Sequence, residues 1–153
     1  MQEDAKNRGA VMRPDIVGFD RNGQIRLVAE VKNRRGVSSE WAARLRGNLS
    51  TATPPPKDAF FLLVFPDKLF LWKPSAPVAH DVRPDVSATV PKWLSEHSSS
   101  TSALEFSTFG WLSDLTRLTS PEGLRDNPLW EWAFSSGLAE SLRGGRVEIE
   151  PQL

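Results

Sequence analysis

The stretch RPDIVGFDRNGQIRLVAEVK, residues 13–32, decides the fold that we expect for this chain of 153 residues. Its centre, Asn22-Gly23, lies between apolar segments and is typical of a β-hairpin, because a type I′ turn needs positive φ at both central positions. A two-residue turn at this point fixes the register of the two strands. The expected opposed pairs are Arg21 with Gln24, Phe19 with Arg26, Val17 with Val28, and Asp15 with Glu30.

This register places two carboxylates opposite each other. Side chains alternate between the two faces of a strand, so Asp15, Glu30 and Lys32 share one face of the hairpin. Directly opposed Cβ atoms lie about 4.5–5.5 Å apart, and like charges at that separation are destabilising. The sequence therefore predicts that a positive group lies between the two carboxylates.

The composition is that of an ordinary globular domain. The chain is 39% hydrophobic and 25% charged, which favours a single domain over residues 1–153. It has no cysteine, which excludes disulfides and thiolate zinc sites. No apolar run approaches 18 residues and the first residues lack a signal-peptide core, so we expect a soluble, cytoplasmic protein without membrane contact.

The net charge is zero but unevenly distributed. Residues 1–57 hold 11 Lys and Arg against 6 Asp and Glu, whereas residues 58–153 hold 8 against 13. Such asymmetry indicates a first half that faces a polyanion, although a surface solvated by both signs of charge gives the same count.

The segments around the hairpin predict a mixed sheet with helices packed on it. The spacing of Trp41, Leu45 and Leu49 predicts a helix over 38–50 with these residues as its apolar stripe, and Ser38 as its cap. Three prolines then end the helix. Further elements are expected as strands at 60–65 and 68–73, irregular chain at 75–91, a loop at 96–102, helices at 103–118 and 127–145, and an edge strand at 146–150.

Two short motifs resemble the PD-(D/E)xK nuclease superfamily. They are Pro14-Asp15 and, after fourteen residues, Glu30-Val31-Lys32. In that superfamily the motif lies on a β-hairpin, a helix follows the ExK strand, and a further strand returns to the sheet. The resemblance covers about residues 13–73, and the part over about 92–153 is expected to be helical.

The resemblance implies both a fold and an activity. The fold is α/β, with a restriction-endonuclease-like mixed central sheet flanked by helices. Asp15 and Glu30 would ligate Mg²⁺ or Mn²⁺ together with the backbone carbonyl of Val31, and Lys32 would position or activate the attacking water. Hard oxygen ligands with open positions suit these cations. The implied activity is that of a metal-dependent phosphodiesterase, an endonuclease-like hydrolase that binds nucleic acid, DNA foremost.

The chain departs from the superfamily before Pro14. The core of the family opens with a helix and a strand, and that helix often carries another acidic residue. The residues here leave room for a short strand around 9–13, and Glu3 or Asp4 could stand in for the missing acid. The departure puts a second metal site and autonomous activity in doubt. It leaves open a non-catalytic interaction module of the same fold, in a homodimer or a larger assembly such as a prokaryotic defence complex.

Simpler explanations exist for each candidate residue. Pro-Asp alone carries little information, since it recurs at Pro66-Asp67 and Pro84-Asp85 without a following ExK. Asp15 and Lys32 could form an ordinary surface ion pair. His80 and His97 are expected to be solvated. Four arginines could contact phosphate or could form a charged helix face: Arg34, Arg35, Arg44 and Arg46.

Overall fold

A six-stranded sheet forms the centre of the computed structural model, which describes residues 14–52, 54–90, 100–117 and 128–149. The strand order is β5-β4-β3-β2-β1-β6. The strands are β1 (Ile16–Phe19), β2 (Ile25–Val31), β3 (Phe60–Val64), β4 (Lys68–Trp72), β5 (Val86–Thr89) and β6 (Arg146–Ile149), and the helices are α2 (Ser39–Ala52), α4 (Thr101–Leu115), α5 (Pro128–Ser135) and α6 (Leu138–Leu142).

The sheet is mixed because one connection is a crossover. β2 and β3 run parallel, and α2 lies between them in the chain, as a parallel pair requires. Every other neighbouring pair is antiparallel. β6 lies outside β1, so strands from the two ends of the described chain pair at one edge of the sheet. The predicted α/β class with a mixed sheet flanked by helices is confirmed.

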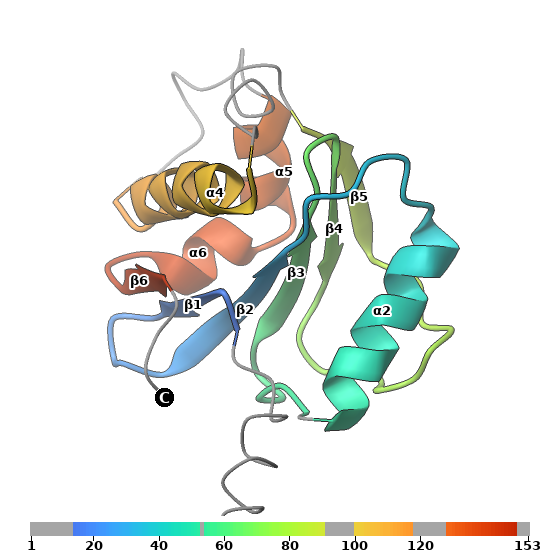
Figure 1. Cartoon of the computed structure of the whole chain (residues 1–153). Coiled ribbons are helices and arrows are strands. Elements are labelled where there is room, and N and C mark those ends of the chain that lie inside the picture. Colours follow the sequence, from blue (N-terminus) through green and yellow to red (C-terminus); the bar gives the residue numbers. More distant parts are fainter. Residues whose placement is uncertain (1–13, 53, 91–99, 118–127, 150–153) are drawn as a thin grey trace, which may run out of the picture.

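Helices cover both faces of the sheet. Figure 1 shows α2 on one side and α4, α5 and α6 on the other. The face under α2 is built from alternate strand residues that include Val28, Phe61, Leu63 and Trp72. The opposite face contains Leu27, Ala29, Leu62 and Leu71, together with Leu104, Trp111, Leu112, Leu115, Leu138 and Leu142 from the helices.

The β1–β2 hairpin has the predicted register away from its turn. Val17 pairs with Val28, but a bulge between Gly18 and Phe19 places Phe19 opposite Ile25 rather than Arg26. The predicted type I′ turn, with its Arg21–Gln24 pair, is wrong. The N–H of Asp20 donates to the carbonyl of Gln24 over 2.9 Å, so the loop has three residues. Of its residues only Gly23 has positive φ, at 82°.

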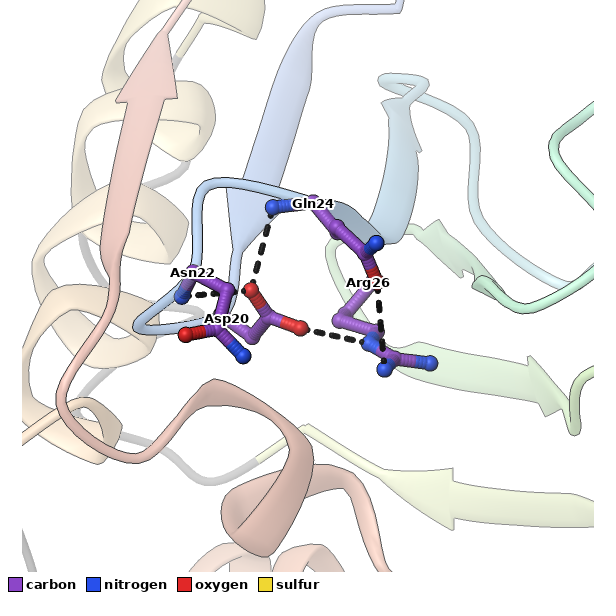
Figure 2. A network of polar contacts seen from close by, with 4 residues as sticks. All are labelled: Asp20, Asn22, Gln24 and Arg26. Carbon is purple, nitrogen blue, oxygen red and sulfur yellow. Dashed lines mark hydrogen bonds and ion pairs between the residues drawn. The ribbon is translucent and has the colours of Figure 1, made fainter.

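The side chain of Asp20 holds this loop (Figure 2). Its Oδ1 accepts hydrogen bonds from the N–H groups of Asn22, at 2.8 Å, and Gln24, at 3.0 Å. Its Oδ2 accepts from Nε of Arg26 at 2.9 Å. A three-residue loop with glycine in the left-handed position is the usual alternative to a two-residue turn, and here the carboxylate stabilises it.

Helix α2 meets the sheet through a different face from the one predicted. Ser38 caps it as expected, since Oγ accepts from the N–H of Trp41 at 3.1 Å. The residues predicted as its apolar stripe, Trp41, Leu45 and Leu49, are only half-buried at its flank. The residues buried against the rest of the molecule are Ala42, Ala43, Arg46, Gly47 and Ser50.

The second half of the chain contains one strand, and one interruption of a helix, that the sequence did not indicate. β5 forms within the stretch expected to be irregular, and it pairs with β4. α4 begins inside the expected loop, where Oγ of Ser100 accepts from the N–H of Ala103 at 3.1 Å. The single helix expected at 127–145 is two helices, separated at Gly137 with φ of 92°. The predicted edge strand at 146–150 is confirmed as β6.

Other expectations concern parts of the chain outside the described residues. These are the strand around 9–13, the acids Glu3 and Asp4, and His97. Within the described ranges, no helix is long and apolar enough to cross a lipid bilayer.

Candidate functional site: a carboxylate pair at the end of β2

Glu30 is a buried residue of charged type beside the apolar residues that α2 covers. It pairs with Leu63 of β3 and lies on the same side of the sheet as Val28, under α2. Its side chain is only 5% exposed. Carboxylates are rarely buried to this extent without a partner, so this position demands a chemical explanation.

Asp15 lies where the predicted register places it. It precedes β1 directly, and Ile16 pairs with Ala29, which brings Asp15 to the end of β2. Oδ2 of Asp15 accepts a hydrogen bond from the main-chain N–H of Val31 at 2.7 Å. The carboxylate thus takes the place of a strand neighbour for Val31, and it is anchored to the same strand that carries Glu30 and Lys32.

The two carboxyl groups interact electrostatically. Burial, and after it the negative charge of Asp15, together raise the pKa of Glu30 to about 8. The ammonium of Lys32 opposes both effects, with Nζ at 4.0 Å from Oε1 of Glu30. Oε2 of Glu30 is buried without a hydrogen-bond partner among the described residues. The expected opposition of two acids beside one lysine is therefore present.

These atoms fit a hard divalent cation. Two carboxylates converge, and one of them has a free buried oxygen. The N–H and C=O of a strand residue point to the same side, so the carbonyl of Val31 faces the side on which Asp15 binds its N–H. Across the described ranges, no group of three or more His, Cys, Asp or Glu is placed to hold a metal ion. A cation here would rely on the pair, the carbonyl and water, as Mg²⁺ often does.

Two of the arginines chosen from the sequence lie close to this end of β2. Arg34 and Arg35 follow Lys32 and are exposed. The guanidinium carbon of Arg34 lies 4.6 Å from the ring centre of Trp41 in α2. Such stacking fixes the direction of a cation while its N–H groups stay available to solvent. Arg44 is also exposed, on the outer side of α2.

Arg46 differs from the expectation. It is 2% exposed, and its two terminal nitrogens donate to the carbonyls of Pro77, at 2.8 Å, and Ala76, at 3.1 Å. Its guanidinium also lies over the rings of Phe61 and Trp72. It joins α2 to the connection between β4 and β5, so it is not presented on the exposed side of α2, where a nucleic-acid backbone could contact it.

Asp67 is a further residue of this region that the sequence did not single out. Its Oδ2 accepts from the N–H of Gly36 at 3.1 Å, and Gly36 has positive φ of 73°. The bond ties the β3–β4 turn to the segment that follows Lys32. The sequence showed only a Pro-Asp turn, because the partner lies thirty-one positions earlier. His80, expected to be solvated, is exposed, and its Nε2 lies 2.7 Å from Oδ1 of Asn48.

Comparisons with known proteins identify no relative of this chain. A scan against protein-family models found no match for the chain. Searches among curated proteins and among solved structures also found none. The chemistry of the site therefore has to be judged from its own residues.

Proposed function

We propose that the chain is a metal-dependent phosphodiesterase of the PD-(D/E)xK type, with a restriction-endonuclease-like fold, that acts on nucleic acid. One observation carries this proposal: the carboxylate of Asp15 is anchored to Val31 beside the buried carboxyl group of Glu30, and Nζ of Lys32 lies at 4.0 Å from Oε1 of Glu30. The four groups come from two short segments that the hairpin brings together. Their types and order along the chain agree with the motif on which the resemblance rests.

The residues that would hold a divalent cation are Asp15, Glu30 and the carbonyl of Val31. A bound Mg²⁺ or Mn²⁺ would supply positive charge to a phosphoryl oxygen and lower the pKa of a coordinated water. It would also satisfy the free oxygen of Glu30 and relieve the repulsion between the acids. Anchoring of Asp15 to the main chain keeps the pair in place before the cation arrives.

Lys32 would act on the substrate directly. Its side chain is 42% exposed, in contrast to the buried Glu30, so the ammonium reaches solvent while its stem stays beside the carboxylates. A positioned ammonium can donate a hydrogen bond to the attacking water and stabilise the charge that develops on the phosphoryl oxygens. Its exposure also means that few packing contacts depend on it.

Three exposed arginines would bind the backbone of the substrate. Arg34 and Arg35 follow Lys32 in the chain, and Arg44 lies on the outside of α2. Contacts with phosphate give affinity without reading sequence, and they weaken as salt rises. Arg46 has no part in this role, because it is buried.

A cleavage assay tests the proposal. Purified protein is incubated with supercoiled plasmid, linear duplex, single-stranded DNA and RNA, each with Mg²⁺, with Mn²⁺ or with chelator. We expect cation-dependent cleavage of at least one substrate by the wild type and none by Asp15→Asn. Activity that survives chelation, or that is equal in Asp15→Asn, would contradict the assignment. Absence of cleavage in every wild-type reaction would count against catalysis itself.

The burial of Glu30 favours a second candidate, a non-catalytic interaction module within a larger assembly. Without a cation, a pKa of about 8 keeps this carboxyl protonated at neutral pH, where it needs no counter-ion. The site would then be a structural feature. Such a protein would show neither cleavage nor a cation-dependent change in melting temperature, whereas a catalyst shows both.

A further inference from the structure

A pocket of about 350 Å³ lies at the other end of the face that α2 covers. It is bounded by Arg46 of α2, the segment before β3 and the segment after β4. Glu30 pairs with Leu63 near the end of β3, whereas the pocket contacts Ala59 and Phe61 at its beginning. The two sites are therefore separate.

The charged residues that line this pocket are all cationic. Arg46, Lys57 and Lys73 line it, and no acidic residue does. None of the three cations forms an ion pair within the described residues. The carboxylate of Asp85 lies near enough to act on Arg46, but its Oδ2 is bound to the N–H of Lys73 at 2.7 Å. A helix C-terminus adds the equivalent of only about half a negative charge.

Arg46 gives the pocket a fixed cationic wall. It is 2% exposed, and the carbonyls of Ala76 and Pro77 hold its two terminal nitrogens. Its Nε is buried without a partner among the described residues. A guanidinium is seldom buried without a carboxylate, because its transfer from water is costly unless an anion compensates. Lys57 and Lys73 are exposed and can turn toward an anion in the pocket.

The remaining walls are flat and apolar. They come from prolines, an aromatic ring and an aliphatic side chain: Pro55, Pro56, Pro77, Phe61 and Val78. Ligand pockets typically combine such walls with a few polar groups that fix orientation, and the volume is at the small end of their range of about 300–1,000 Å³.

We propose that this pocket binds a phosphate monoester attached to a flat, apolar body, such as a nucleoside monophosphate. Three cations without an acid suit a group of charge about −1.5 to −2, which a phosphate monoester has and a carboxylate lacks. The flat body lies against the prolines and Phe61, and the phosphate lies between Lys57 and Lys73, beside the fixed positive charge of Arg46. The site does not depend on the carboxylate pair.

Binding of phenyl phosphate, followed by calorimetry on the whole chain, tests this proposal. We expect phenyl phosphate to bind more tightly than inorganic phosphate, which has no flat body, and more tightly than benzoate, which has one charge. The double variant Lys57→Gln/Lys73→Gln should weaken binding at least about tenfold, since each lysine contributes a charge-assisted hydrogen bond. Adenosine monophosphate should compete for the same site.

Three further variants make the outcome decisive. Val78→Glu, at a position 42% exposed, places a carboxylate at the mouth of the pocket and should abolish binding. Lys68→Gln removes an exposed lysine outside the pocket, and Asp15→Asn alters the carboxylate pair; both should bind as the wild type does. Absence of binding at millimolar phenyl phosphate overturns the proposal. The proposal is also overturned if Lys68→Gln weakens binding as much as Lys57→Gln/Lys73→Gln does, since binding would then reflect general surface charge.

Discussion

The carboxylate of Asp15 accepts a hydrogen bond of 2.7 Å from the main-chain N–H of Val31. This contact joins a residue before β1 to the strand that carries Glu30 and Lys32, so the sheet holds the carboxylate of Asp15 in place beside that strand. Rigid support of this kind keeps reacting groups in place without reorganisation.

Mn²⁺ should stabilise the wild type more than Asp15→Asn. Asparagine can still accept the hydrogen bond of Val31, so the variant should fold, but it offers the cation one charge less. A ligand at a hundred times its Kd stabilises the native state by about 2.7 kcal/mol. Melting curves recorded with and without Mn²⁺ should show a clear increase for the wild type and a much smaller one for the variant. Equal increases in the two proteins would place cation binding elsewhere.

Lys32→Ala should lower the cleavage rate steeply and leave the fold intact. The side chain is 42% exposed, and exposed substitutions usually change stability by no more than about 0.5 kcal/mol. Removal of one preorganised electrostatic donor typically lowers a rate on the order of a hundred- to a thousandfold. Lys32→Arg should not restore activity, because a planar guanidinium does not replace a compact ammonium. Initial rates of plasmid cleavage, set beside melting curves, measure both effects.

An alternative role for Lys32 predicts the reverse pattern. If it serves only as counter-ion to Glu30, Lys32→Ala would destabilise the metal-free protein and added Mn²⁺ would restore its stability. A cleavage rate equal to that of the wild type in Lys32→Ala would remove the lysine from the mechanism.

The free energy of unfolding of the metal-free protein should fall as pH rises from about 4.5 to about 8. Burial and Asp15 raise the pKa of Glu30 from 4.5 to about 8, so the folded state binds this proton more tightly than the unfolded chain does. The contribution of Glu30 to the free energy of unfolding is complete below the unfolded-state pKa of 4.5 and lost above the folded-state pKa of about 8. Between these values the free energy of unfolding should fall by up to about 1.4 kcal/mol per pH unit.

Urea titrations in chelator at several pH values measure that slope. Glu30→Gln carries no titrating group and should flatten it. Glu131→Gln, at an exposed position of α5, is the matched control and should retain the wild-type dependence. An identical slope in Glu30→Gln would mean that another group is responsible.

Arg46→Ala should destabilise the fold far more than Arg44→Ala. Its loss leaves the carbonyls of Ala76 and Pro77 without their donors and opens space beside Trp72. Together these effects should cost about 2–5 kcal/mol. Arg44 lies two positions away on the exposed side of α2, and its removal should change stability by no more than about 0.5 kcal/mol. Chemical denaturation of the two variants under one set of conditions compares them directly.

Alanine at two helical glycines should have opposite effects. A Cβ on Gly47 would lie 2.7 Å from Cα of His80 and 2.9 Å from the carbonyl oxygen of Ala79, so Gly47→Ala must push the β4–β5 connection away from α2. A Cβ on Gly110, in α4, meets nothing within 4 Å. Gly110→Ala should therefore stabilise the protein by about 1 kcal/mol through helix propensity. Thermal denaturation should show a lower midpoint for the first variant and a higher one for the second.

The parts of this structure that were predictable are those set by local pattern. The position of the Asn-Gly turn predicted the pairing of Val17 with Val28, and this pairing is correct although the turn type is not, because the bulge between Gly18 and Phe19 offsets the extra loop residue. The error arose because the carboxylate of Asp20 stabilises a longer loop, a side-chain contribution that the Asn-Gly signal does not contain.

The parts that escaped prediction depend on contacts between distant segments. Arg46 was assigned to the surface because it is charged, yet its partners are carbonyls about thirty positions later in the chain. β5 is a short strand among prolines, and only its pairing with β4 defines it. The opposition of Asp15 and Glu30 was predictable from the register, but the bond of Asp15 to Val31 was not.

The pairing of β6 with β1 has a consequence for synthesis of the protein. Phe19 pairs with Arg146, and at elongation rates of about 5–20 residues per second the ribosome makes Arg146 on the order of ten seconds after Phe19. During that interval the outer edge of β1 has open hydrogen-bonding groups beside side chains that the finished fold buries. Such an edge invites pairing with other nascent chains. Shortened forms that lack β6 should therefore aggregate during translation, and chaperones that shield strand edges should raise the yield of the full chain.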